Sequence, residues 1–134
     1  MSFVLDASVA CAWLFPDETA PALEDLLDQA AVEEVFVPGL WRSEVMNVLV
    51  QASRRDRISP DAIVEIWALL DRLQIRESAY RAPVDQIVGL CQKYGLTAYD
   101  AHYLALALWL RLPLATLDGP LAAAAVREGL KVLS

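Results

Sequence analysis

The sequence predicts an α/β fold: a three-layer α/β/α sandwich around a short parallel sheet. Short apolar runs alternate along the chain with longer segments whose apolar residues recur every three or four positions. Capping residues precede several of the longer segments, and Gly95 follows one of them, as is typical of helix ends. Because alternating strands and helices form parallel sheets through right-handed crossovers, this order predicts helices on both faces of one sheet.

Five short apolar runs are the expected strands. In chain order they are residues 2–6, 35–37, a short edge strand around Ile75, 114–117 and 130–133. The first is a continuous apolar run that ends in Asp6, which is typical of a strand buried on both faces. Ile75 is the weakest of the five signals, because a single apolar residue marks it.

Seven segments are the expected helices. In chain order they cover residues 8–15, 23–30, 39–55, 59–70, 83–94, 97–110 and 121–128. Ser8, Thr97 and the pair Ser59-Pro60 are suited to helix starts, and Gly95 is suited to a helix end. The helix over 39–55 ends in a cationic cluster, which favours a helix C-terminus.

Composition indicates one domain over residues 1–134, without a membrane segment. The longest apolar run, 103–110, is too short to cross a bilayer. Asp6 follows Phe3-Val4-Leu5 directly, which argues against a secretory signal, so we expect a cytoplasmic protein. Hydrophobic residues make up 57% of the chain, so we expect a dense core or a subunit interface.

The charge and the cysteines restrict the function classes. A net charge of −7 argues against a nucleic-acid binder, although a metal bound to an acidic cluster would change the local balance. Cys11 and Cys91 lie in apolar helical patterns, so we expect buried, reduced thiols. With two cysteines and one histidine, the chain offers no zinc site of the usual ligand types.

Four acidic residues form the candidate site. Asp6 and Asp118 close two expected strands, Asp100 lies in the first turn of an expected helix, and Glu44 lies in the middle of another. If the two strands are neighbours where the strand order reverses, both aspartates enter one crevice. Each acid also has a structural explanation: Asp6 and Asp118 suit helix caps, Asp100 suits a capping box, and Glu44 suits a solvated flank.

Carboxylates brought together in one crevice repel one another and need a counter-charge. Mg²⁺ and Mn²⁺ prefer carboxylate and water oxygens, so a divalent cation is the expected partner. Such an ion lowers the pKa of water and offsets charge on a phosphoryl oxygen. Because no side chain resembles a nucleophile, the four acids favour metal-dependent hydrolysis of a phosphodiester.

The motifs that carry these acids resemble those of a known family. Val4-Leu5-Asp6-Ala7-Ser8, residues 44–49, Leu96-Thr97-Ala98-Tyr99-Asp100-Ala101 and residues 114–118 are similar, in this order, to the motifs of PIN domains of the VapC toxin type. The resemblance covers the whole chain. It implies a metal-dependent endoribonuclease that forms a homodimer and is inhibited by a VapB-type antitoxin.

The resemblance also implies roles for individual residues. Asp6, Glu44, Asp100 and Asp118 would be the catalytic metal ligands for Mg²⁺ or Mn²⁺. Ser8, Asn47 and Thr116 would orient these carboxylates or water. Some relatives carry another acid after the last aspartate, where this chain has Gly119-Pro120, so the number of metal ions stays open.

Other features favour structural roles or rival functions. We expect His102 to lie on a different helix face from Asp100, and Trp41 and Trp67 to lie in the core or a dimer interface. The arginines at 54, 55 and 57 are either a solvated helix end or phosphate contacts. An aspartyl phosphatase is disfavoured by serine at position 8, and a receiver domain by the placement of Lys131. A PIN-fold protein that binds RNA without cutting it is the remaining rival.

Overall fold

The fold is built on one parallel sheet. The computed structural model describes residues 1–134. Its strands are β1 (Val4–Leu5), β2 (Val35–Val37), β3 (Ile75–Glu77), β4 (Leu114–Ala115) and β5 (Val132–Leu133). They are ordered β3-β2-β1-β4-β5, and every neighbouring pair is parallel. The order therefore reverses between β1 and β4, where Leu5 pairs with Ala115.

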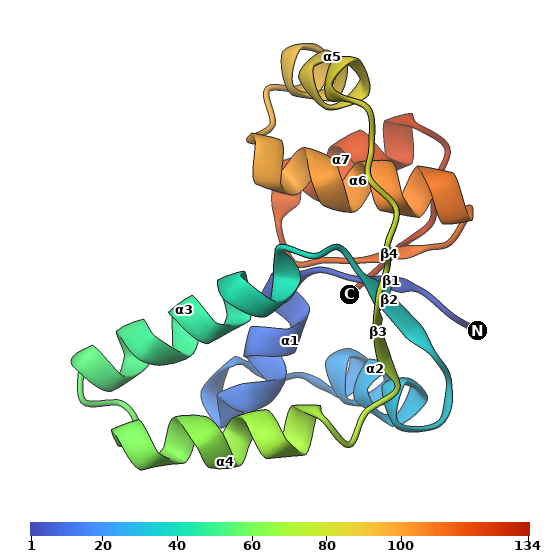
Figure 1. Cartoon of the computed structure of the whole chain (residues 1–134). Coiled ribbons are helices and arrows are strands. Elements are labelled where there is room, and N and C mark those ends of the chain that lie inside the picture. The colour runs from blue at the N-terminus through green and yellow to red at the C-terminus, as the bar shows by residue number, and fades with distance from the viewer.

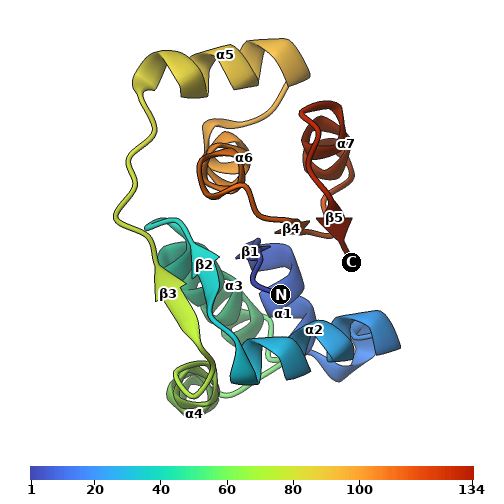
Figure 2. The same cartoon turned by 90° about the vertical axis from the view of Figure 1, so that its right-hand side faces the viewer.

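Seven α-helices cover the two faces of this sheet. They are α1 (Ala7–Leu14), α2 (Pro21–Val32), α3 (Trp41–Arg54), α4 (Pro60–Leu70), α5 (Val84–Tyr94), α6 (Ala98–Leu110) and α7 (Gly119–Arg127), with a 3-10 turn η1 (Pro16–Glu18) after α1. Helices α5, α6 and α7 lie on one side and α1 to α4 on the other (Figures 1 and 2). The expected three-layer α/β/α sandwich is thereby confirmed. None of the helices is long and apolar enough to cross a membrane.

The core follows from the apolar strands and from helix α6. Val4 and Leu5 of β1 and Leu114 and Ala115 of β4 have no solvent exposure, so the centre of the sheet is buried on both faces. Helix α6 packs on β1 and β4 and carries a continuous buried segment from Tyr103 to Ala107. Helix α5 packs on α6 as an outer layer. The short strands are therefore fixed by packing on both faces.

Several predicted helix ends are confirmed by their hydrogen bonds. The Ser59 and Thr97 hydroxyls accept from the amides of Ala62 and Asp100, at 3.2 and 3.1 Å, and so cap α4 and α6. Gly95 ends α5 with φ of 67°, a conformation that glycine adopts without strain. The edge strand at Ile75 is also confirmed.

Three expectations about where helices begin were wrong. Helix α3 begins at Trp41 rather than Gly39, because a turn in which the Trp41 amide donates to the Pro38 carbonyl precedes it, so Glu44 lies in the first turn and not mid-helix. Ser8 lies inside α1 and does not cap it; its hydroxyl bonds to Asp6 instead. Helix α7 begins two residues early, because Asp118 caps it.

Candidate active site

Asp6 is the buried centre of the candidate site. It follows β1 directly, and only 5% of its surface is exposed. The hydroxyls of Ser8 and Thr116 both donate to its Oδ2, at 2.6 and 2.7 Å. Ser8 also accepts from the amide of Leu117, and Thr116 from the amide of Asp118, so the two hydroxyls tie the ends of β1 and β4 together. Oδ1 of Asp6 is left without a side-chain partner.

Asp118 and Asp100 are positioned by helix starts. Asp118 lies three residues after β4, which ends at Ala115 and not at Leu117 as expected. Its Oδ1 accepts from the amide of Leu121 at 2.8 Å, so the capping interpretation of this residue is correct. Asp100 lies in the first turn of α6, and its amide donates to the Thr97 hydroxyl. A cap uses one carboxylate oxygen, so capping by Asp118 leaves its second oxygen available to a ligand.

Glu44 is held by a residue that the sequence did not single out. The hydroxyl of Tyr103, whose side chain is fully buried, donates to Oε1 of Glu44 at 2.5 Å. Tyr103 lies three residues after Asp100 on α6, which places the two on neighbouring positions of one helix face. The sequence did contain a signal for this contact, because Tyr103 shares a helix face with the candidate acid Asp100. Tyr103 was interpreted only as part of an apolar run.

The four carboxylates lie in one another's electric field. Burial raises the pKa of Asp6, and the charge of Asp118 adds to the effect. Burial also raises the pKa of Glu44 and of Asp100, and in both the charge of Asp6 contributes. No lysine or arginine forms a salt bridge with any of the four. The group is therefore a cluster of negative charge without a cationic side chain to offset it.

The donor set fits a hard divalent cation in type. Carboxylate oxygens are the ligands that Mg²⁺ and Mn²⁺ prefer, and the mutual repulsion of these four is relieved by a positive charge. As the side chains stand, no three carboxylate, histidine or cysteine groups are close enough together to form a metal site. Hydrogen bonds hold Asp6, Glu44 and Asp118 through one oxygen each, so the other oxygens must turn inward for a shared ion.

The predicted orienting residues divide into two groups. Ser8 and Thr116 contact Asp6 directly, in the geometry that fixes a carboxylate. Asn47 lies one turn after Glu44 on the exposed side of α3 and makes no hydrogen bond with any of the four acids. The roles of these residues and of the four acids in catalysis and metal binding stay predictions at this point.

His102 and the arginines lie outside the carboxylate cluster. The ring of His102 bonds through Nδ1 to the carbonyl of Ala98, on its own helix, which agrees with the expected separation from Asp100. Arg57 forms a salt bridge with Asp17 and lies over the ring of Phe15. Arg55 is exposed and forms no salt bridge.

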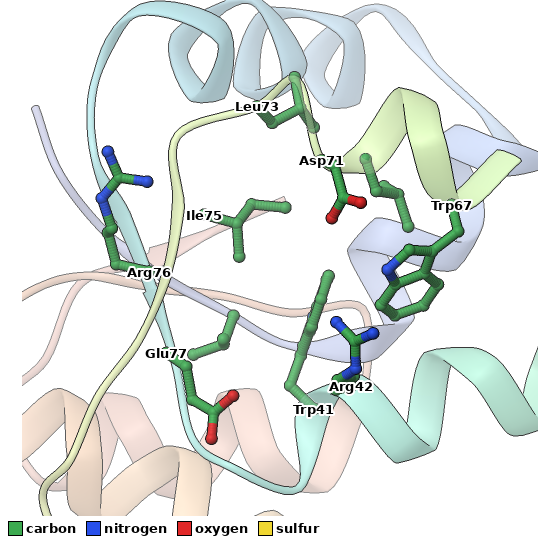
Figure 3. Close-up of a pocket in the computed structure, with 10 residues that line it drawn as sticks. Trp41, Arg42, Trp67, Asp71, Leu73, Ile75, Arg76 and Glu77 are labelled. Carbon is green, nitrogen blue, oxygen red and sulfur yellow. The ribbon is translucent and has the colours of Figure 1, made fainter.

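Trp41 and Trp67 line a separate small pocket between α3, α4 and the sheet edge (Figure 3). Trp41 is buried, and the two rings lie 6.0 Å apart at 52°, with Arg42 over Trp67. The pocket measures ≈ 140 Å³ and contains none of the four acids. Trp41 therefore has the expected core position, and this pocket is not part of the candidate site.

Comparison with known proteins decides the family. The family model of the PIN domain matches residues 3–133, nearly the whole chain. The chain belongs to the PIN domain family. The resemblance noted in the sequence is thereby confirmed, since this PIN domain is similar to proteins named as VapC ribonucleases.

Two such relatives align with most of this PIN domain. Ribonuclease VapC3 of Pyrobaculum aerophilum is 32% identical over 126 residues, which cover 91% of this chain and 93% of the relative. Ribonuclease VapC9 of Mycobacterium tuberculosis is 34% identical over 123 residues, which cover 86% of this chain and 84% of the relative.

Solved structures share the fold at lower identity. PAE2754 from Pyrobaculum aerophilum superposes with a TM-score of 0.72 and 22% identity, covering 98% of this chain and 89% of that chain. VapBC2 from Rickettsia felis, bound to a DNA fragment from its promoter, gives 0.66 and 14% identity over 98% of this chain and 97% of that chain. At these identities the superpositions show a common fold.

The charge cluster predicts a pH-dependent stability difference. Because burial raises the pKa of Glu44, the folded chain holds that proton more tightly than the unfolded chain does. Stability is therefore lost as pH rises from about 4.3, the ordinary glutamate value, through the raised folded pKa. In chelator, Glu44→Gln should raise the melting temperature by a few degrees at neutral pH and by nothing below about pH 4. The glutamine oxygen can still accept from Tyr103.

Glu65→Gln, on the exposed side of α4, is the matched control for this measurement. It removes the same charge outside the cluster, so its melting temperature should follow that of the unmodified chain at every pH. If the two variants change melting temperature equally across the titration, burial does not raise the pKa of Glu44 as described above.

Proposed function

We propose that this PIN domain is a metal-dependent endoribonuclease and the toxin of a toxin–antitoxin pair. The observation that carries the proposal is the convergence of four carboxylates, Asp6, Glu44, Asp100 and Asp118, where β1 and β4 end, with no cationic side chain to offset them. The names of the VapC ribonucleases support RNA as the substrate.

The chain's own residues would position the ion and the substrate. Ser8 and Thr116 hold Asp6 through Oδ2, so Oδ1 would be the oxygen that binds the ion, while Tyr103 holds Glu44. Asp100 and Asp118 add the remaining charge from the starts of α6 and α7. When bound, Mg²⁺ or Mn²⁺ supplies a water of lowered pKa and a counter-charge for the phosphoryl oxygens.

The antitoxin is proposed from the solved relatives. One similar structure is a toxin–antitoxin complex from Klebsiella pneumoniae, with a TM-score of 0.63 at 20% identity, which covers 90% of each chain. A VapB-type antitoxin that places a basic side chain in the carboxylate cluster would supply the charge that the cluster lacks. A homodimer and a cytoplasmic location stay predictions.

The first test is cleavage of total cellular RNA, with the cut ends mapped. The unmodified chain should cut RNA with Mg²⁺ or Mn²⁺ and should not cut it with chelator. Asp6→Asn should lower the cleavage rate by at least about 100-fold, because it removes one of the charges that hold the ion. Thr116→Val should lower it by about 10- to 100-fold, because Asp6 loses one orienting hydrogen bond.

Asp25→Asn, on the exposed side of α2, makes the same chemical change outside the site and should cleave normally. Melting curves of all variants exclude unfolding as the cause of a loss. Undiminished cleavage by purified, folded Asp6→Asn would disprove the mechanism. RNA that is bound but never cut, with either metal, would instead favour a catalytically silent PIN-fold protein.

Expression in cells tests the toxin assignment separately. Inducing the unmodified chain alone should arrest growth, because an unopposed ribonuclease degrades cellular RNA, while Asp6→Asn should allow growth at the same protein level. Unimpaired growth in cells that accumulate an active enzyme would leave a ribonuclease that is not a toxin.

A further inference from the structure

One face of α3 carries a row of side chains that runs through the candidate site. Leu40, Glu44, Asn47, Gln51 and Arg55 are spaced by four, three, four and four residues, which places them along one side of a helix. The row extends for about 22 Å at the helical rise per residue. Glu44, a member of the carboxylate cluster, lies one helical turn from the Leu40 end of the row.

Three surface depressions follow this row and adjoin one another. The middle one, of ≈ 380 Å³, is lined by Glu44, Asn47 and Tyr99. It shares Asn47 with a depression of ≈ 340 Å³ beside the end of α3, and Leu40 with one of ≈ 470 Å³ beside the segment that follows β3. We call the three together the α3 trough. It leads away from the carboxylate cluster in two directions.

Each outer depression carries an arginine without an acidic partner. Arg55 lines one and Arg81 the other; both are exposed and neither forms a salt bridge. A carboxylate also lines each, Glu18 and Glu77 respectively. The chain has a net charge of −7, so cations without an acidic partner are notable. Two of them lie at the ends of the trough, on either side of Glu44, where they could contact phosphates.

The middle depression offers an aromatic surface next to the acids. Tyr99 immediately precedes Asp100, and 64% of its surface is exposed. Its hydroxyl takes part in no hydrogen bond with the rest of the chain, so the ring is not tied to another side chain through it. An exposed ring beside a reaction centre can stack on an unpaired nucleobase. A base within a duplex is already stacked and cannot reach such a ring.

We propose that the α3 trough binds a single-stranded segment of RNA. Arg55 and Arg81 contact phosphates on opposite sides of the cut, and Tyr99 stacks on a base next to it. The inference rests on the proposed ribonuclease function and adds the surface that would hold the RNA and three positioning residues. Cations at both ends of the trough match the regularly spaced negative charges of a phosphate backbone.

The test is binding of short fluorescent oligoribonucleotides, taken from around the mapped cut, to the Asp6→Asn protein in Mg²⁺. Arg55→Ala and Arg81→Ala, each added to this background, should weaken binding several-fold. Each should also reduce the slope of log affinity against log salt by about 0.7, the value for one single-strand phosphate contact. Arg127→Ala, exposed on α7 across the sheet, removes the same charge and should change neither quantity.

Tyr99 is tested with two variants and a modified RNA. Tyr99→Ala should weaken binding by about 5- to 100-fold, and Tyr99→Phe should bind normally, because stacking needs the ring and not the hydroxyl. An oligoribonucleotide that lacks the base at the stacked position should bind both variants equally. Oligoribonucleotides too short to reach the ends of the trough should respond to Tyr99→Ala and not to the arginine variants.

Several results would overturn the inference. A base-paired RNA that binds as tightly as the single strand excludes the proposed substrate form. The phosphate contacts are excluded if Arg55→Ala and Arg81→Ala leave the slope of log affinity against log salt unchanged. They are also excluded if Arg127→Ala lowers that slope equally. Arginine variants that resist inhibition by the antitoxin but bind RNA normally make the trough a protein interface.

The same variants in the cleaving background separate this inference from the proposed function. If the unmodified chain cuts RNA and the trough variants keep its kcat/KM, the function stands and the trough is not the RNA path. If the unmodified chain neither cuts nor binds RNA, the function fails, and the inference with it.

Discussion

The two hydroxyl hydrogen bonds to Asp6 are the interaction on which the rest of the site depends. They come from Ser8 and Thr116, residues on either side of the β1–β4 pair, and both end on one oxygen of one buried carboxylate. A carboxylate this deeply buried is costly unless its hydrogen bonds are satisfied. The bonds thus fix Asp6 at the strand reversal and leave its other oxygen for a ligand.

The positions of the other acids show how the fold tolerates so much negative charge in one place. Asp6 and Asp118 immediately precede α1 and α7, while Glu44 and Asp100 lie in the first turns of α3 and α6. The start of a helix carries a partial positive charge and free amide donors. Four helix starts that gather at one end of the sheet (Figure 1) therefore offset part of the repulsion. Burial, with a smaller contribution from the neighbouring acids, still raises the pKa values of Asp6, Glu44 and Asp100.

Local signals in the sequence located most of the elements and singled out the four acids, whose roles stay predictions. Thr97 and Gly95 mark helix ends through their own backbone chemistry, and strands that end in Asp6 and Asp118 place those residues at one sheet edge once the parallel order is assumed. The start of α3 was missed because the turn after Pro38 could not be distinguished from a helix. That error also misplaced Glu44 relative to its helix.

Contacts between distant residues were beyond local reasoning. The hydroxyl of Ser8 was predicted as a cap because nothing near it in the sequence indicates Leu117, its partner across the sheet. Tyr103 was noted only as the start of an apolar run, and its bond to Glu44 joins two helices that lie on opposite faces of the sheet. The likeness to PIN domains supplied Ser8 and Thr116 as orienting residues, which the spacing alone could not do.

The most direct test of this account is the position of Mn²⁺ in crystals of the unmodified chain, located by anomalous scattering. The account requires a manganese peak beyond the carboxyl ends of β1 and β4, with the free oxygen of Asp6 at coordinating distance, about 2 Å, and at least one other of the four carboxylates turned toward it. Four ordered carboxylates with no peak among them at millimolar Mn²⁺, or with a peak elsewhere on the molecule, would contradict it.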